Sequence, residues 1–479
     1  MTEGGKAIYR LLNGSIGGDI IVSVLERDNR GRPVAVDARY QEALDYIYSF
    51  IDYEKQPRPR DAIHYDLRRM DELFARLGNP HLKAKTVHIT GSKGKGSTAA
   101  MIASVLTTSG YTTGLYTSPH LYIFNERIRV DGKLITDQEI VTLVNKLKPE
   151  VTAVNEKATY GKLTTFEVIT ALGFLYFESK QVDYQVIEVG LGGRLDATNV
   201  VKPEVCIITS ISLEHTDVLG NTLAEIATEK SGIIKPACVT VISPQADEAK
   251  QVIEKACRDI GVKLIQVGRD VTWQPLDFDI KQQSLKAKGR LGNYEVSIPL
   301  LGQYQLENAA TAVAALEVLM EKDSRITKKS ISKGLAQVSW PGRLQVLNRR
   351  PLIVADGAHN PYSAGKLREA LKHYFNFEKA ILIIGLSADK NVAGIISELA
   401  PLFDKVIATH SVHPRAMPTA ALAAELKKQG VRAEETEDIS VALPLALSMT
   451  GRKDLICVTG SLFVAAGAIE QAPALGLRP

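Results

Sequence analysis

Short apolar runs alternate with segments of helical periodicity along most of the chain. The first series of predicted strands covers residues 86–90, 112–118, 184–190, 205–212 and 238–243. Apolar runs of this length are typical of strands that are buried on both faces, and their alternation with helices favours a mostly parallel sheet. The pattern therefore predicts a doubly wound α/β domain.

A second series of the same kind follows at residues 352–357, 380–387, 405–410 and 455–461. Between the two series, residues 270–300 alternate apolar and polar positions around a Leu-Gly-Asn turn, which predicts a β-hairpin region. Pro341 and Gly342 interrupt the pattern. We therefore expect a large domain over residues 39–340, which opens with a helix near Tyr40, and a smaller α/β domain over residues 341–479. Residues 1–38 form an N-terminal extension whose role the pattern does not explain.

Composition narrows the class of protein. The chain has 479 residues, 45% of them hydrophobic, with a net charge of +4. This small charge, without a dense basic run, argues against a nucleic-acid partner. No apolar run approaches the ~18 residues that span a bilayer, and no signal-peptide core is present, so we expect no membrane partner and a cytoplasmic location. Four cysteines without CxxC spacing predict buried, reduced thiols rather than disulfides or a structural metal.

A glycine-rich segment, His-Ile-Thr-Gly-Ser-Lys-Gly-Lys-Gly-Ser-Thr-Ala-Ala, occupies residues 88–100 between a predicted strand and a predicted helix. It departs from GxxxxGK[ST], because Ile89 stands where the first glycine should be and Gly96 separates Lys95 from Ser97. A helix N-terminus nevertheless directs backbone N–H groups at an anion, and Lys95 adds a cation. The alternative is a turn that Ser97 caps without any ligand. The strand-loop-helix context favours a phosphate site.

Polar residues follow several predicted strands. Ser118, Glu188 and His215 all lie at or just beyond carboxyl ends, where doubly wound sheets bind ligands. A hydroxyl, a carboxylate and an imidazole near a phosphate loop predict a Mg²⁺ site. Each residue also has a simpler interpretation: Ser118 precedes a turn that a proline initiates, His215 caps a helix and Glu188 pairs with Arg194.

Lys230 occupies an unusual position. Leu223, Ile226, Ala227 and Lys230 recur at helical spacing, so the lysine lies on the apolar stripe. Burial disfavours the ammonium, and a neutral amine can react with CO₂ to give a carbamate that binds metal ions. The alternative is a lysine that extends from the helix end to solvent.

The later part of the chain contains further polar groups in distinctive surroundings. Asn308 lies in QLENAATAVAAL, Arg343 in WPGRLQVL, and Asp356 and His359 in VADGAHNP. Arginine can neutralise a phosphate, and Asp356 can hold a ribose hydroxyl or orient a base. Alone, the last segment could be a turn at the end of a strand.

Taken together, these motifs resemble the folylpolyglutamate synthase/dihydrofolate synthase family, a branch of the Mur ligase superfamily. The resemblance runs from about residue 40 to about residue 466 and rests on GSKGKGS, TSPHL, TTFE, IEVGLGGRLDATN, TSISLEHTDVLG, EKSGIIK, GRLQV, DGAHNP and TGSLF, in family order. It implies an N-terminal P-loop ATPase domain followed by a smaller Rossmann-like α/β domain. The chain departs from the family pattern at Ser92-Lys93, where Thr-Asn is usual, and at Glu214, where Asp is commoner.

The resemblance also implies roles for individual residues. Gly94, Lys95, Gly96, Ser97, Asn308, Arg343, Asp356 and His359 would bind ATP. Ser118, Glu188, His215 and a carbamylated Lys230 would organise two Mg²⁺ ions. Thr164, Phe166, Asp196 and Ala197 would form the pterin pocket, with Phe166 stacking on the ring system, and Arg127 would lie near a substrate carboxylate. Lys95, Lys230, His215 and His359 would contribute to catalysis, although the residues alone do not identify a general base.

The activity that the resemblance implies is ATP-dependent amide formation. A pterin substrate carboxylate attacks ATP to give an acyl phosphate, and the amine of L-glutamate then attacks the activated carbonyl. The acceptor is dihydropteroate, a reduced folate or both, and the RLDATN segment resembles bifunctional bacterial members. The family resemblance suggests a monomer. Two alternatives remain, a Mur-type ligase acting on a UDP-linked peptide and a nucleotide-binding regulatory protein without catalysis.

Overall fold

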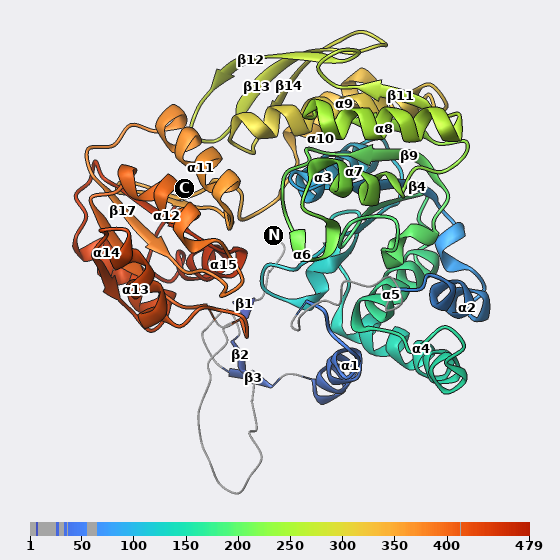
Figure 1. Cartoon of the computed structure of the whole chain (residues 1–479), viewed down its shortest axis with the longest axis horizontal. Coiled ribbons are helices and arrows are strands. Elements are labelled where there is room, and N and C mark those ends of the chain that lie inside the picture. Colours follow the sequence, from blue (N-terminus) through green and yellow to red (C-terminus); the bar gives the residue numbers. More distant parts are fainter. Residues whose placement is uncertain (1–5, 8–24, 28–32, 36, 55–64, 412) are drawn as a thin grey trace, which may run out of the picture.

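The computed structural model describes residues 6–7, 25–27, 33–35, 37–54, 65–411 and 413–479 (Figure 1). Most of the predicted N-terminal extension lies outside these ranges. Its described parts form three short antiparallel strands in the order β1-β2-β3: β1 (Lys6–Ala7), β2 (Leu25–Arg27) and β3 (Pro33–Ala35). Within the described ranges, every helix is too short or too polar to cross a membrane.

An eight-stranded sheet forms the centre of the larger part of the molecule, in the order β11-β10-β9-β4-β8-β5-β6-β7. Its strands are β4 (Lys85–Thr90), β5 (Thr113–Tyr116), β6 (Ile128–Val130), β7 (Lys133–Leu134), β8 (Tyr184–Glu188), β9 (Pro203–Ile208), β10 (Val239–Ile242) and β11 (Lys263–Gln266). The pairs from β11 to β5 are parallel, whereas β6 and β7 add an antiparallel edge. The mostly parallel α/β sheet is confirmed, and β4 lies at its middle.

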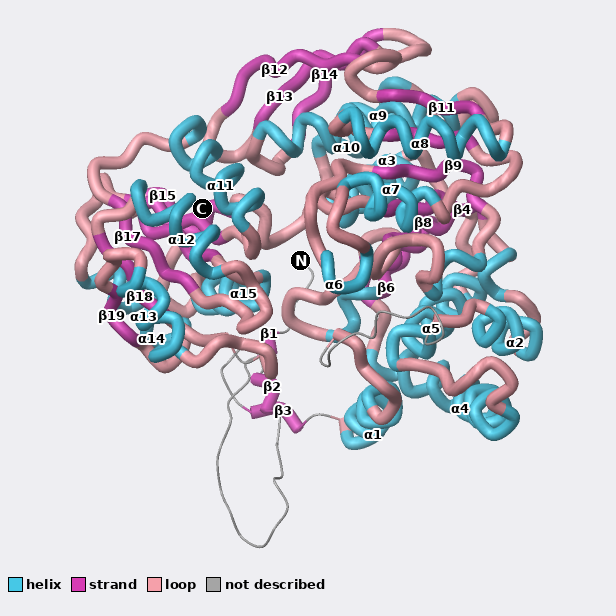
Figure 2. Tube along the Cα trace, viewed as in Figure 1, coloured by secondary structure: helices cyan, strands magenta, loops and turns pink. Residues whose placement is uncertain are grey.

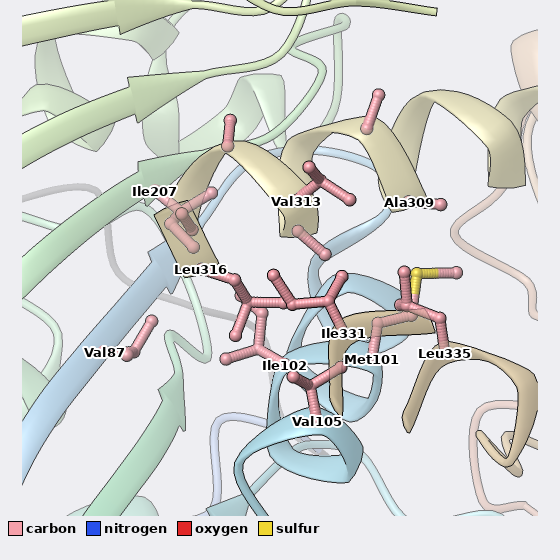
Figure 3. Packing of buried hydrophobic residues seen from close by; sticks show 14 of the residues in the cluster. Val87, Met101, Ile102, Val105, Ile207, Ala309, Val313, Leu316, Ile331 and Leu335 are labelled. Atoms are coloured by element: carbon pink, nitrogen blue, oxygen red, sulfur yellow. The ribbon is translucent and has the colours of Figure 1, made fainter. Parts of the chain in front are cut away.

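Helices cover both faces of this sheet because successive side chains of each strand point to opposite sides. Val87 and Ile207 face α3 (Lys95–Thr108), α9 (Gln303–Met320) and α10 (Lys328–Ala336), as Figure 3 shows. On the other face, Ile187 packs with α1 (Ala38–Tyr48), α2 (Arg68–Arg76), α4 (Asp137–Lys157) and α5 (Thr165–Ser179). Cys206 and Ile208 pack with α7 (Leu223–Ser231) and α8 (Asp247–Ile260), and the short α6 (Thr216–Leu219) precedes α7.

The predicted hairpin region is a three-stranded antiparallel sheet. Its strands are β12 (Thr272–Phe278), β13 (Gln283–Lys288) and β14 (Asn293–Ile298), in that spatial order. The predicted Leu-Gly-Asn turn joins β13 to β14, and Gly292 takes a φ of 141° there. The prediction of one hairpin was incomplete, because β12 adds a further strand whose residues are mostly exposed. This small sheet packs on α9 (Figure 1).

The C-terminal region is a second doubly wound sheet, in the order β15-β16-β20-β17-β18-β19. Figure 2 shows this region with β15, β17, β18 and β19 labelled. Its strands are β15 (Gln345–Arg349), β16 (Leu352–Ala355), β17 (Ala380–Ile384), β18 (Lys405–Ala408), β19 (Ala433–Glu435) and β20 (Leu455–Thr459). One face packs on α11 (Pro361–Tyr374), α12 (Val392–Leu399) and α13 (Thr419–Lys428), and the other on α14 (Ile439–Ser448) and α15 (Leu462–Gln471). The two large sheets fall on either side of residue 340, while the exact domain boundaries stay a prediction.

All four cysteines are buried and unpaired, as expected. Cys206 lies in β9, Cys457 in β20 and Cys257 in α8, and Cys238 directly precedes β10. Burial raises the pKa of the Cys457 thiol, which keeps it protonated and unreactive.

Candidate functional site

The glycine-rich loop joins the central strand β4 to α3 and has little room for side chains. Gly94 has a φ of 93°, and a Cβ added there would lie 2.3 Å from Asn308 Oδ1. A Cβ added at Gly91 would lie 1.9 Å from Thr209 Oγ1. Only glycine combines this backbone freedom with these close approaches. The loop therefore places the N-terminus of α3 against α9 and leaves its N–H groups directed at the end of the sheet.

Two lysine ammoniums converge on one carbonyl of this loop. Lys95 Nζ and Lys230 Nζ each donate a hydrogen bond of 2.9 Å to the carbonyl oxygen of Gly91. Lys230 is only 1% exposed, which confirms that it lies on the buried stripe of α7. Burial lowers its pKa to about 8, so a minor fraction of the amine is neutral near neutral pH.

Glu214 is the anion that balances this group of lysines. Its Oε1 lies 3.4 Å from Lys230 Nζ and its Oε2 lies 3.4 Å from Lys93 Nζ. Burial alone would raise the pKa of the Glu214 carboxyl, but the charges of Lys230 and Lys93 outweigh it and lower that pKa to about 2. Glu214 is therefore a carboxylate under all physiological conditions.

The predicted metal ligands lie at the same end of the sheet. Ile89 pairs with Glu188 in the register of β4 and β8, which brings the carboxylate beside the loop. The backbone N–H of Ser118 donates to Glu188 Oε2 over 3.3 Å. Burial raises the pKa of Glu188 to about 7. The proposed alternative pairing of Glu188 with Arg194 is wrong, since Arg194 pairs with Glu229 at 2.8 Å.

His215 occupies a different environment from Glu188. It is exposed, takes a φ of 47° and precedes α6, but its side chain makes no capping hydrogen bond to that helix. Among the residues that the structure describes, no three His, Cys, Asp or Glu side chains are arranged to hold a metal ion. The assignment of Ser118, Glu188, His215 and Lys230 as Mg²⁺ ligands therefore stays a prediction.

Residues of α9 connect the loop to the centre of the domain. Gln305 Nε2 donates to Ser97 Oγ over 3.2 Å, and Asn308 Nδ2 donates to Gln305 Oε1 over 2.9 Å. All three side chains are buried. They form a continuous polar chain from α9 to the first turn of α3, in the position that the sequence predicts for nucleotide contacts.

The C-terminal region contributes Arg343, Asp356 and His359. Asp356 accepts hydrogen bonds from the backbone N–H groups of Leu344 (2.8 Å) and Ala358 (2.9 Å), and burial raises its pKa. Asp356 therefore also stabilises the turn that follows β16. Arg343 Nη1 donates to the carbonyl of Gly342 over 3.1 Å, and His359 Nε2 lies 3.4 Å from Lys93 Nζ of the loop.

The predicted pterin residues line a single cavity of about 170 Å³ beside β8. Phe166 forms one wall, and a Cβ at Gly190 would lie 2.4 Å from its Cζ, so this glycine admits the ring. Thr164 caps α5 through a reciprocal pair of hydrogen bonds with Glu167, and Asp196 Oδ1 accepts from the N–H of Thr198 over 3.0 Å. Ala197 completes the set. The structure thus brings all four residues together.

Arg127 differs from the expectation of a group next to the substrate. It is fully buried and holds Glu54 through two hydrogen bonds, of 3.0 and 2.6 Å. Burial lowers the pKa of Arg127, but the adjacent Glu54 carboxylate outweighs that effect and raises it. Glu54, not Arg127, lines the cavity, so Arg127 orients a cavity residue here.

Sequence reasoning missed several residues of the site. Glu54 and Arg69 line the cavity, and Arg69 pairs with the buried Glu167 at 3.0 Å. The TTFE motif could have identified Glu167 through its capping-box spacing. Lys93 and Glu214 were noticed only as departures from a family pattern, and no local signal shows that they form an ion pair.

Comparison with known proteins adds independent information. Residues 89–316 match the family model of the Mur ligase middle domain, and residues 342–462 match that of the Mur ligase, glutamate ligase domain. The chain is similar to dihydrofolate synthase/folylpolyglutamate synthase of Bacillus subtilis (35% identity; 88% of this chain, 97% of that protein). It is also similar to folylpolyglutamate synthase of Lacticaseibacillus casei (36% identity; 90% of this chain, 98% of that protein).

Solved structures agree with these similarities over nearly the whole chain. Mycobacterium tuberculosis folylpolyglutamate synthase complexed with ADP superposes with a TM-score of 0.82 at 31% identity, covering 91% of this chain and 98% of that one. Escherichia coli FolC in complex with DHPP and ADP gives a TM-score of 0.79 at 28% identity, with the same coverage.

Proposed function

This chain belongs to the folylpolyglutamate synthase/dihydrofolate synthase family of Mur ligases, and from that membership we propose that it joins L-glutamate to the carboxylate of a pterin substrate with cleavage of ATP. It is an ATP-dependent carbon–nitrogen ligase of folate metabolism.

One hydrogen bond connects the glycine-rich loop, where ATP would bind, to the cavity in which the pterin would bind. Thr90, the last residue of β4, donates a hydrogen bond of 2.6 Å from Oγ1 to the carbonyl oxygen of Gly192. Thr90 leads into the phosphate loop, and Gly192 is part of the wall of the cavity that contains Phe166 and Asp196. The proposed phosphate site and the proposed pterin pocket are therefore adjacent at one end of the sheet. This arrangement suits transfer of a phosphoryl group to a substrate held in the pocket.

In this proposal ATP lies along the loop and the start of α3. Gly94, Lys95, Gly96 and Ser97 bind its phosphates, with Asn308 behind Gly94. Arg343, Asp356 and His359 complete the nucleotide site from the C-terminal region. The confined backbone at Gly94 and the convergence of Lys93, Lys95 and Lys230 support a polyanionic ligand, because the single negative charge of Glu214 does not balance three ammonium groups.

The neighbouring oxygen donors fit a divalent cation. Glu188 and Ser118 supply a carboxylate and a hydroxyl, the donors that Mg²⁺ prefers, and we include the exposed His215, which precedes α6, as a further ligand. Lys230 can join them only as a carbamate, because an ammonium has no lone pair and Mg²⁺ prefers oxygen ligands to a neutral amine. When bound, Mg²⁺ would neutralise charge on the transferring phosphoryl group.

The chain's own residues have defined tasks in the reaction. Phe166 and Asp196 hold the pterin so that its carboxylate reaches the γ-phosphate, and Lys95 with the loop N–H groups stabilises the charge that develops there. The resulting acyl phosphate is attacked by the amine of L-glutamate, and phosphate leaves.

The acceptor range, cellular location and assembly complete the proposal. We propose that dihydropteroate and a reduced folate are both acceptors, because the Bacillus subtilis relative is named dihydrofolate synthase/folylpolyglutamate synthase. The enzyme acts on small molecules in the cytoplasm as a monomer, without nucleic acid or membrane.

Purified protein tests the function directly. It is incubated with Mg-ATP, L-glutamate and either dihydropteroate or tetrahydrofolate, and phosphate release is recorded. The proposal predicts release that requires both the pterin and glutamate. ATP binding without turnover would instead support the regulatory protein, and turnover with a UDP-linked peptide alone would support the cell-wall ligase.

A further inference from the structure

The side chain of Lys93 bridges the two parts of the molecule at the phosphate loop. Its Nζ lies 3.4 Å from Glu214 Oε2 in the central region and 3.4 Å from His359 Nε2 in the C-terminal region. Only 22% of the side chain is exposed. Lys95 of the loop and Lys230 of α7 donate to the carbonyl of Gly91, whereas Lys93 reaches His359 in the C-terminal region.

The backbone around Lys93 is fixed before the side chain makes these contacts. The N–H groups of Ser92 and Lys93 both donate to the carbonyl of Ser210, over 2.9 and 3.1 Å. Ser92 Oγ donates to the carbonyl of Ser212 over 3.0 Å. These bonds tie the loop to the segment that carries Glu214, so the direction of the Lys93 side chain is set by the fold.

His359 presents the matching acceptor. Its Nδ1 lies 2.8 Å from the carbonyl oxygen of Gly357, a group that can only accept, so Nδ1 carries the proton. In the neutral ring Nε2 is then an acceptor, and it faces the Lys93 ammonium. The hydrogen-bond pattern therefore selects one tautomer of a neutral His359.

We propose that Lys93 is a positioning residue for the nucleotide site, which holds His359 as the neutral Nδ1–H tautomer and secures the C-terminal region against the phosphate loop. The inference rests on the proposed function in treating His359 as a nucleotide-site residue. Lys93 of the loop and Glu214, which follows β9, form one ion pair at 3.4 Å, so the same ammonium that faces His359 is also held by the central region.

The charges around His359 support the same arrangement. The Lys93 ammonium is the main cause that lowers the pKa of His359 to about 3, and burial acts in the same direction. Lys390 also lowers this pKa, whereas the Gly357 carbonyl and Glu214 raise it. The ring is consequently neutral throughout the physiological range, and loss of Lys93 removes the largest single effect.

The test uses the full-length protein with ¹³C-labelled histidine. The His359 signal, one of nine, is assigned by its loss in His359→Gln. We expect no titration of His359 between about pH 5 and pH 8 in the native protein or in Lys93→Arg, and titration towards the ordinary value of about 6.5 in Lys93→Gln. Lys83→Gln, which removes an exposed lysine, is the matched control and should behave as the native protein.

Kinetics supply the second readout. Because the assembled site is less populated without the bridge, Lys93→Gln should raise KM for ATP about tenfold with a smaller change in kcat, and Lys93→Arg should restore it. Native His359 that titrates near 6.5, or unchanged titration in Lys93→Gln, would show that the contact does not exist. A shifted titration with unchanged KM would show that the contact does not position the site. Inactive native protein with a non-titrating His359 would instead count against the proposed function alone.

Discussion

Lys95 and Lys230, which are 135 residues apart in the numbering, share the carbonyl oxygen of Gly91 as a hydrogen-bond acceptor, each at 2.9 Å. One lysine begins α3 and the other lies near the end of α7. Their shared acceptor brings two cations together at the loop, where the Glu214 carboxylate lies 3.4 Å from Lys230. This arrangement is suited to receive phosphate oxygens and to hold Lys230 as a partly neutral amine.

Replacement of Lys230 by alanine should abolish most activity. The substitution removes the buried amine and leaves Glu214 without one partner, so we expect kcat to fall about 100-fold or more. Lys255→Ala, an exposed lysine on the next helix, is the control and should retain native kcat. Steady-state ADP release measures both. Full activity in Lys230→Ala would contradict a role in the reaction, and an intact-protein mass without added CO₂ under mild conditions would contradict the carbamate.

Gly94→Ala should weaken ATP binding strongly and lower the free energy of unfolding only slightly. The new Cβ would lie 2.3 Å from Asn308 Oδ1, which must move away from the loop. We expect the Kd for ATP, measured by calorimetry, to rise at least about tenfold, together with a loss of about 1 kcal/mol in the free energy of unfolding from the left-handed backbone.

Gly110→Ala provides the matched control at the other end of α3. Gly110 has a φ of 85°, but a Cβ there meets nothing within 4 Å. This variant should show the same loss of stability with an unchanged Kd for ATP. Equal Kd values in the two alanine variants would mean that Asn308 does not matter for the nucleotide.

Phe166→Ala should affect the pterin and spare ATP. Removal of the ring opens one wall of the cavity and removes a stacking surface, so the Kd for dihydropteroate should rise about tenfold or more. The Kd for ATP should stay native, which is the opposite of the result for Gly94→Ala. Parallel weakening of both ligands in Phe166→Ala would indicate that the variant disturbs the sheet rather than a separate pocket.

The parts of the site that periodicity controls were predictable from the sequence, and the parts that depend on domain packing were not. Burial of Lys230 follows from its spacing with Ile226 and Ala227. The ion pair of Lys93 with Glu214, and the contact of Lys93 with His359, join segments 121 and 266 residues apart. No local pattern encodes such distances. The contacts of Arg127 could not be predicted either. Its position in a sequence motif does not reveal that its guanidinium donates two hydrogen bonds to Glu54.

The strands of the two large sheets also divide into predictable and unpredictable ones. The apolar strands at the centre of both sheets were predicted because burial on both faces leaves a continuous apolar run. The edge strand β19 (Ala433–Glu435) was not predicted, because it is short and its residues are largely exposed. Strand β12 was under-predicted for the same physical reason.

His88 should make the protein less stable in acid. It is fully buried in β4, Nε2 lies 2.9 Å from Thr198 Oγ1, and burial lowers its pKa to about 3. Below about pH 6.5 the His88 imidazole is protonated in the unfolded state, whereas in the folded state it stays neutral down to about pH 3. The stability due to neutral His88 is therefore complete above about pH 6.5 and is lost as pH falls, by up to about 1.4 kcal/mol per unit.

Urea unfolding of native protein and His88→Asn at several pH values isolates this effect. His81, with a pKa lowered to about 4 by burial, acts in the same direction, whereas Glu188, Glu307 and Glu470, with pKa values raised to about 7 by burial, act in the opposite direction. These groups are present in both proteins and cancel. The native protein should be more stable near neutral pH, and its advantage should shrink between about pH 6.5 and pH 4. A constant difference would contradict the assignment.

The fate of the substrate's carboxylate oxygen tests the central claim most directly. In the proposed reaction this carboxylate attacks the γ-phosphate, ADP leaves, and the amine of glutamate then displaces the phosphate. Dihydropteroate labelled with ¹⁸O in its carboxylate should therefore transfer one labelled oxygen to each inorganic phosphate formed with glutamate and Mg-ATP, as mass spectrometry would show. Unlabelled phosphate, released alongside glutamylated product, would contradict the acyl phosphate and with it the proposed use of the loop and the pocket as one site.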